Sequence, residues 1–276
     1  MLAIVLGLGS SLSWGVADFL GGLASRRVGA LTVVAVSQLA GLVVLAAILA
    51  VRREPVPPAS DLGLGAAAGA VGAAGLAAFY RALAVGSMSL VAPVAALGAV
   101  IPVAVGVAGG DRLGPATAIG LPLALAGAVL VGRARGPATR RGLKLAVVAA
   151  LGFGLFFTLL APAADHDVLW ASAMARVASV PTVVIAALVT GAGLALPRRL
   201  APVVVFAGLL DTTANVAFAA ASQRGLISVV AVLGSLYPVA TVALARAVLG
   251  ERVGRAQAAG VAAALAGVVL IAAGAA

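Results

Sequence analysis

Three charged residues, Asp18, Arg176 and Asp211, lie inside long stretches of apolar sequence. If these stretches are helices that cross a bilayer, keeping a charge there is costly, and such residues commonly serve substrate or ion transfer. Asp211 lies near the middle of its stretch, and Asn215, one helical turn later, shares its face. Because burial favours the neutral form of a carboxyl, Asp211 is predicted to act as a proton carrier. The alternative is a purely structural hydrogen bond to a neighbouring helix.

Further side chains within the apolar stretches could contact a substrate. Arg176 keeps its charge, so it either binds an anionic group or pairs with one of the two carboxyls. Trp14 precedes Asp18 by one turn and is either a stacking wall or a lipid-facing residue, while Gln38 and Tyr237 add polar groups. The predicted substrate-binding set is Trp14, Asp18, Gln38, Arg176, Asp211, Asn215 and Tyr237.

Prolines within the apolar stretches are candidate hinges. Pro93, Pro102 and Pro238 each remove one backbone donor and free a carbonyl, which can bend a helix or face a cavity. The alternative is that they only shape helix packing, and Pro181 is open to the same two interpretations.

Signals for an enzyme or a metal site are weak. The chain has no cysteine and one histidine, His166, which lies between two aspartates in a predicted solvated loop. A zinc site normally needs more nitrogen or sulfur ligands than this loop offers. No Walker-type phosphate loop is present, so transport driven by ATP on this chain is not expected. We therefore predict no catalytic residue, no metal and no cofactor.

The composition indicates a membrane protein. Hydrophobic residues make up 63% of the chain and charged residues 9%, whereas soluble domains carry roughly 25% charged residues. The 35 glycines favour close helix packing in lipid. The net charge of +10 resides mostly in short gaps between apolar stretches, which indicates membrane orientation and not nucleic-acid binding.

The apolar stretches predict an all-α polytopic membrane protein with ten transmembrane helices. Each stretch is close to the roughly 20 residues that a spanning helix needs, and in lipid the backbone groups must be satisfied within the helix. The predicted spans are 2–23, 30–51, 62–80, 88–108, 113–131, 143–164, 168–190, 200–222, 226–245 and 253–275.

An internal repeat divides the chain into two halves. A shift of 139 residues aligns Trp14-Gly15 with Phe153-Gly154, and Phe79 with Phe218. A shift of 140 aligns residues 124–130 with 264–270. The predicted division is a first five-span repeat at 1–132, a basic linker at 133–142 and a second repeat at 143–276. Because five is odd, the halves must be inverted with respect to each other, as in many secondary transporters.

Residues 218–274 carry a recognisable pattern. It comprises Tyr237-Pro238, then Leu249-Gly250-Glu251-Arg252, then a glycine-rich last span. This pattern resembles the EamA repeat of the drug/metabolite transporter superfamily. The first half matches it more loosely, with Asp111 in place of the glutamate. We expect both acidic residues to pair with the arginine that follows each of them.

The resemblance implies ten helices, alternating access and, commonly, export of metabolites, amino acids or toxic compounds. We therefore predict a secondary transporter of a bacterial inner membrane, an exporter driven by a proton gradient or a substrate gradient. The alternatives are a lipid-modifying membrane enzyme and a non-transporting scaffold. The two charge signs near mid-membrane suit a zwitterion, held in a central cavity between the first, second, seventh and eighth spans with the fourth and ninth. The resemblance names neither a particular substrate nor an oligomeric state.

The basic residues predict an orientation. Thirteen Lys and Arg residues lie on the side that contains the linker, and four lie on the other side. The positive-inside rule places the linker in the cytoplasm and both termini outside.

Overall fold

The computed structural model describes residues 1–131, 140–250 and 254–274, and all regular secondary structure in these parts is helical. The helices are α1 (Leu2–Ser25), α2 (Ala30–Arg52), α3 (Ala59–Val85), α4 (Met88–Ala96), η1 (Leu97–Ala99), α5 (Val100–Ala108), α6 (Pro115–Val131), α7 (Arg140–Ala163), α8 (Val168–Thr190), η2 (Arg198–Leu200), α9 (Ala201–Ser222), α10 (Ile227–Gly234), α11 (Tyr237–Leu249) and α12 (Arg255–Gly274).

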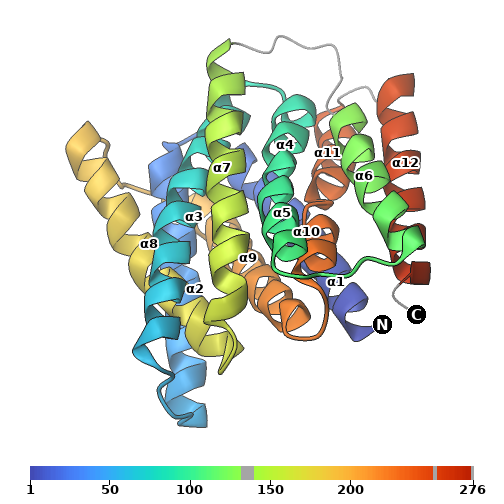
Figure 1. Cartoon of the computed structure of the whole chain (residues 1–276). Helices are drawn as coiled ribbons and strands as arrows, with labels where there is room; N and C mark the ends of the chain where they lie inside the picture. Colours follow the sequence, from blue (N-terminus) through green and yellow to red (C-terminus); the bar gives the residue numbers. More distant parts are fainter. Residues whose placement is uncertain (132–139, 251–253, 275–276) are drawn as a thin grey trace.

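These helices form the ten predicted membrane passes, because α4–η1–α5 and α10–α11 each make one interrupted pass (Figure 1). Eight passes in the described chain are long and apolar enough to cross a bilayer. The other two, α6 and α12, hold shorter apolar segments, Pro115–Gly127 and Ala258–Gly267. The predicted all-helical membrane fold is therefore confirmed, and the last pass of each half is its shortest.

The two interrupted passes break at matching places in the repeat. In the first half the α-helix tightens into η1, and in the second Ser235 and Leu236 form a turn. Pro102 and Pro238 lie in the first turn after each break, where the missing backbone N–H costs nothing. Pro93 lies within α4, about one turn before η1. The prolines thus flank the breaks, and their role as hinges stays a prediction.

The two halves run in opposite directions. Helix α1 starts at the end of the molecule where the N-terminus lies, whereas its counterpart α7 starts at the opposite end (Figure 1). Helix α12 finishes at the same end at which α1 starts, as an even number of passes requires.

Helices of one half pack mainly against helices of the other. Helix α1 contacts α9, α10 and α11, and α7 contacts the corresponding α3, α4 and α5. Helix α2 packs against its own counterpart α8, and α6 against α12. This reciprocal pattern is what a pseudo-two-fold axis between the halves produces, and it places α1 and α7 at the interface between the halves.

Equivalent glycines allow these central crossings. A Cβ atom on Gly15 of α1 would lie 2.7 Å from the carbonyl oxygen of Tyr237. A Cβ atom on Gly154 of α7 would meet the carbonyl oxygen of Gly98 in the same way. Gly15 and Gly154 are aligned by the repeat, as are Gly98 and Tyr237. Both α1 and α7 therefore approach the opposite half at a point where a side chain would not fit.

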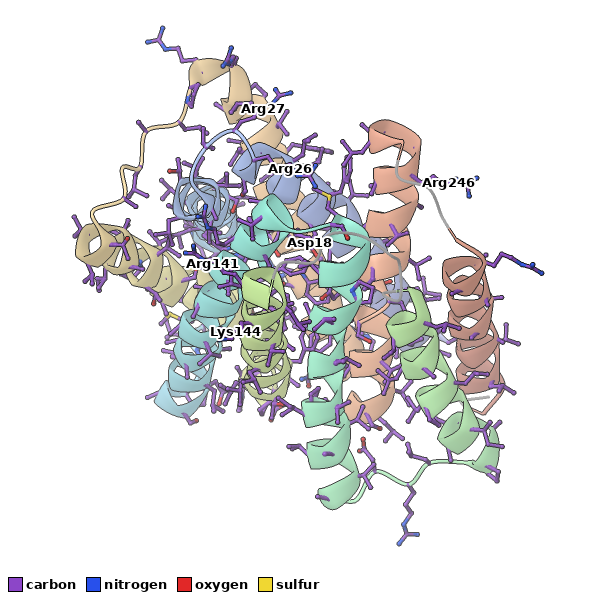
Figure 2. The ribbon with its side chains drawn as sticks, turned by 90° about the horizontal axis from the view of Figure 1, so that it is seen from above. Asp18, Arg26, Arg27, Arg141, Lys144 and Arg246 are labelled. Carbon is purple, nitrogen blue, oxygen red and sulfur yellow. The ribbon has the colours of Figure 1, made fainter. Side chains whose placement is uncertain are left out.

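One end of the molecule is basic. Figure 2 looks onto the end where α7 starts and labels basic side chains from the α1–α2 loop, from the start of α7 and from α11. These residues are Arg26, Arg27, Arg141, Lys144 and Arg246. All five belong to the side predicted to face the cytoplasm.

Candidate functional site

A cavity of about 510 Å³, including its part open to solvent, lies between the halves. It is bounded by α1, α2, α3, α7, α8, α9 and α11, and its lining residues are Trp14, Asp18, Gln38, Gly69, Gly72, Ala73, Leu76, Phe153, Phe156, Phe157, Ala175, Arg176, Asp211, Asn215 and Tyr237. All seven residues of the predicted substrate-binding set are among them. Their contact with a substrate stays a prediction.

The helices around the cavity differ in part from those predicted. Helices α3 and α7, the third and sixth passes, line it, whereas no lining residue in the described chain comes from α4 or α5. Helix α3 can line the cavity because the face that it turns toward α7 and α8 carries glycines. A Cβ atom on Gly72 would lie 2.7 Å from the Phe156 ring. A Cβ atom on Gly69 would overlap the backbone carbonyl of Ala175. Close packing at these glycines brings α3 to the cavity, and α4 packs against α7 and α11.

A buried ion pair lies on one side of the cavity. The Arg176 Nη2 atom on α8 is 2.8 Å from Oδ2 of Asp211 on α9. Gln38 on α2 joins them, because its Nε2 donates to Asp211 Oδ2 over 3.1 Å and its Oε1 accepts from Arg176 Nη1. Ser179 also donates to this oxygen over 2.9 Å. Charge-assisted hydrogen bonds of this kind are stronger than neutral ones, so they fix the positions of all these side chains.

Trp14 on α1 adds a second side chain of the first half to this network. Its indole nitrogen lies 3.1 Å from Asp211 Oδ1 and 3.0 Å from Asn215 Oδ1, both of which accept its hydrogen. Asp211 and Asn215 therefore share a helix face, as their spacing predicts. Both oxygens of the Asp211 carboxyl are occupied, one by Trp14 and the other by Gln38 and the guanidinium.

Asp18 and Asp211 are both buried carboxyls in the same cavity, but they differ in their hydrogen-bond and ion-pair partners. In the described part of the chain, no hydrogen-bond donor and no cation contacts the Asp18 carboxyl. The two nearby hydroxyls donate elsewhere, Tyr80 to the Ala17 carbonyl over 3.5 Å and Tyr237 to the Ala92 carbonyl over 3.4 Å. Asp18 is therefore a buried acid whose polar atoms face only the cavity.

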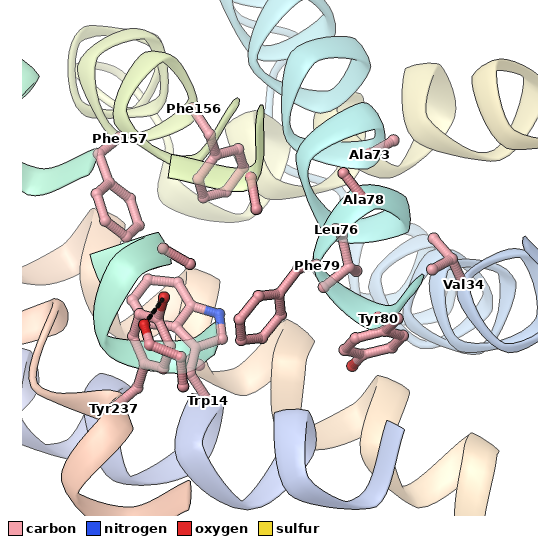
Figure 3. Close-up of a cluster of buried hydrophobic side chains, with 14 of the residues drawn as sticks. Trp14, Val34, Ala73, Leu76, Ala78, Phe79, Tyr80, Phe156, Phe157 and Tyr237 are labelled. Atoms are coloured by element: carbon pink, nitrogen blue, oxygen red, sulfur yellow. Dashed lines mark hydrogen bonds between the residues drawn. The ribbon is translucent and has the colours of Figure 1, made fainter. Parts of the chain in front are cut away.

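The rings of Trp14, Phe153, Phe156 and Phe157 form an apolar wall of the cavity, and the buried rings of Phe79 and Phe218 pack against this wall (Figure 3). Trp14 lies 5.7 Å from Phe218, and Phe79 lies 5.4 Å from Phe153, between ring centroids. The repeat aligns Trp14 with Phe153 and Phe79 with Phe218, so each pair is the counterpart of the other. Phe157 stacks on Phe218 at 4.6 Å. Ring pairs of this kind give a rigid surface for an apolar group.

Sequence reasoning missed the phenylalanines of α7. Phe153, Phe156 and Phe157 line the cavity, and Phe157 also contacts Trp14 at 5.3 Å. Uncharged side chains in an apolar stretch carry no signal of their own. The signal that could have found Phe153 was its alignment with Trp14 in the repeat.

The acidic junction of the first half has a different partner from the one predicted. Asp111 Oδ2 accepts from the backbone nitrogen of Ser228 over 3.1 Å and from its hydroxyl over 2.7 Å. Ser228 is in the first turn of α10, so Asp111 caps this half-helix from the other half of the protein. No ion pair between Asp111 and Arg112 is found in the described chain. Glu251 and Arg252 lie outside the described residues.

The side chain of His166, in the loop before α8, also has a partner. His166 Nδ1 lies 2.6 Å from Asp61 Oδ2 at the start of α3, although its side chain is 62% exposed. Across the described ranges, no cluster of three or more His, Cys, Asp or Glu side chains could hold a metal ion.

Comparisons with known proteins agree with this architecture. The family model described as the EamA-like transporter family matches residues 1–133 and 140–273. A solved structure described only as "Crystal structure of protein" is 19% identical, and the alignment covers 98% of each chain with a TM-score of 0.74. This likeness concerns the fold. No curated protein matches the chain.

Proposed function

Because the chain belongs to the EamA-like transporter family, we propose that it is a secondary transporter that exports a small zwitterion of the amino-acid class by alternating access. The family is one of membrane transporters, so the alternative of a lipid-modifying enzyme does not apply. The bilayer that would house it is a bacterial inner membrane.

The observation that carries this proposal is the separation of charges in the cavity. Arg176 is buried, and its Nε atom has no hydrogen-bond partner within the described residues. This atom is enclosed by protein, so a substrate carboxylate would reach it only when the surrounding helices move, and could then bind the guanidinium beside Gln38. The free carboxyl of Asp18 offers the complementary group for an ammonium. In a low-dielectric cavity this pair of opposite charges favours a molecule that carries both.

The aromatic wall supports the same class of substrate. Trp14, Phe153 and Phe157 offer ring surfaces to the side chain of the molecule, while its charged end faces the polar network. A cavity of this volume can hold a molecule of amino-acid size. An amino acid with an apolar side chain fits both features.

Alternating access would use the inverted halves. The interrupted passes α4–η1–α5 and α10–α11 pack against α7 and α1 of the opposite half, and a proline lies close to each break. Helix breaks near the midplane are typical of transporters in which one half rocks against the other. We propose that movement at these breaks opens the cavity to each side in turn.

The proposal is tested by counterflow in proteoliposomes that contain the purified full chain. We expect radiolabelled leucine to exchange with unlabelled leucine, and we expect much weaker competition from leucinamide, which lacks the carboxylate, and from N-acetylleucine, which lacks the ammonium. Arg176→Gln should abolish the exchange, whereas Arg141→Gln, a change of an exposed arginine at the basic end, should preserve it. Equal competition by leucinamide and leucine would contradict a zwitterion site, and a growth-resistance screen with toxic metabolites would then identify the substrate.

A further inference from the structure

We propose that Asp18, and not Asp211, is the carboxyl that carries the coupling proton, and that Asp211 stays ionised to hold Arg176 in the cavity. This inference rests on the proposed transport function. It follows from the different partners of two buried carboxyls that line one cavity.

Asp211 is poorly suited to release and rebind a proton. Its oxygens receive the guanidinium of Arg176 at 2.8 Å, the Gln38 amide at 3.1 Å and the Trp14 indole at 3.1 Å. All of these groups are donors and stabilise the ionised form. Protonation of Asp211 would leave the Arg176 charge buried without a counter-ion, which is strongly unfavourable.

Asp18 has the opposite surroundings. It is 4% exposed, and no described donor or cation contacts its carboxyl. Asp211 on α9 and Tyr237 on α11 line the same cavity, and the Tyr80 hydroxyl on α3 donates to the carbonyl of Ala17, the residue next to Asp18. The Arg176 guanidinium on α8 already forms an ion pair with Asp211. A buried carboxylate beside a second carboxylate requires a positive charge, and a proton or a substrate ammonium can supply it.

The position of Asp18 suits both ligands. It lies on α1, a helix at the interface between the halves, and inside the bundle when viewed from the basic end (Figure 2). Trp14, one turn away on the same helix, bonds to Asp211, so the two carboxyls and the aromatic wall share one space. Movement of α1 against α10 and α11 would therefore carry Asp18 between the two access states.

The coupling step is a competition for one carboxylate. In the outward-open state a hydronium ion in the cavity transfers its proton to an Asp18 oxygen, which forms an O–H bond and leaves neutral water. In the inward-open state the substrate ammonium approaches, the O–H bond breaks, and the proton leaves to cytoplasmic water. One proton enters for each molecule exported, because Asp18 cannot hold both ligands together.

The first test does not depend on any substrate. Infrared spectra of the purified full chain in detergent, recorded over a range of pH, would show the carbonyl stretch of a protonated buried carboxyl. We expect one such band to titrate in the parent protein, to vanish in Asp18→Asn, and to persist in Asp165→Asn, a change of an exposed acid. Asp18→Glu should shift the band without abolishing it. A band that survives in Asp18→Asn and disappears in Asp211→Asn would overturn the proposal.

The second test measures coupling. In proteoliposomes loaded with radiolabelled leucine, an imposed pH gradient should accelerate leucine release severalfold in the parent and should have no effect in Asp18→Asn. Gel filtration would establish that the variant is folded. An unchanged response to the gradient in Asp18→Asn would refute the proton role while leaving transport intact. Absence of leucine transport in the parent would contradict the proposed function, and the infrared titration would still decide the role of Asp18.

Discussion

The indole nitrogen of Trp14 donates to the carboxyl of Asp211 over 3.1 Å and so joins the first helix of one half to the third helix of the other. The two residues are 197 positions apart in the chain. This bond is a direct connection between the aromatic wall and the ion pair, and it lies where the halves would have to move past each other. Changes on either side of it should therefore affect transport as well as stability.

Replacing Trp14 by phenylalanine should weaken substrate binding. The ring remains, but Asp211 and Asn215 lose their shared donor, and leaving buried acceptors unpaired costs about 1–3 kcal/mol. We expect the KM for leucine exchange to rise about tenfold, since each 1.4 kcal/mol corresponds to a factor of ten. The matched control is Trp170→Phe, because the buried Trp170 indole nitrogen has no partner among the described residues. An equal effect of both changes would show that the hydrogen bond is unimportant.

Substitutions at the two residues of the Arg176–Asp211 ion pair should have strongly non-additive effects on stability. Arg176→Gln or Asp211→Asn alone leaves one charge buried without its partner, a loss of roughly 3–5 kcal/mol. The double variant removes both charges and should be more stable than the two single losses predict. Thermal unfolding of the four proteins in detergent measures this coupling. If the two single effects simply add, the pair is not a coupled unit.

Alanine at Gly15 should disturb the central crossing of α1. The added Cβ atom would lie 2.5 Å from the Ala240 side chain and 2.7 Å from the Tyr237 carbonyl. Overpacking of this kind typically costs about 1–3 kcal/mol, and leucine exchange should fall with stability. Gly9→Ala on the same helix is the control, because nothing lies within 4 Å of its Cβ position. A harmless Gly15→Ala would mean that the helices separate easily at this point.

Loss of the Asp111 cap should destabilise the interrupted pass. Asp111→Ala removes the acceptor for the Ser228 backbone and hydroxyl, and loss of a helix cap costs about 0.5–2 kcal/mol. The melting temperature should fall accordingly, whereas Arg112→Ala should leave it nearly unchanged. The reverse result would restore the interpretation in which Arg112 is the partner of Asp111.

The basic end is predicted to face the cytoplasm. A reporter that fluoresces only in the cytoplasm should stay dark when it is fused after Ala276. It should be bright when the chain is cut and fused after Gly136, within the predicted cytoplasmic linker. Fluorescence after Ala276 would reverse the predicted orientation.

The sequence alone determined the membrane class, the ten passes and the two halves. These features depend on local properties, because an apolar stretch must satisfy its own backbone in lipid whatever surrounds it. The same reasoning singled out Asp18, Arg176 and Asp211, since an ionisable residue within an apolar span is recognisable from the sequence before its partner is known. The repeat likewise contained the correspondence of Trp14 with Phe153, which appears in the structure as two equivalent ring pairs.

Only the tertiary structure decided which carboxyl is partnered. The sequence allowed Arg176 to pair with either Asp18 or Asp211, because both are aspartates in apolar helices and both are distant from it in the chain. Packing of α8 against α9 and α2 brings the guanidinium to Asp211 and leaves Asp18 facing the cavity. The same packing brings α3 and α7 to the lining and Asp111 to Ser228. Such contacts depend on the crossing of helices far apart in sequence, which residue type and spacing within one helix do not specify.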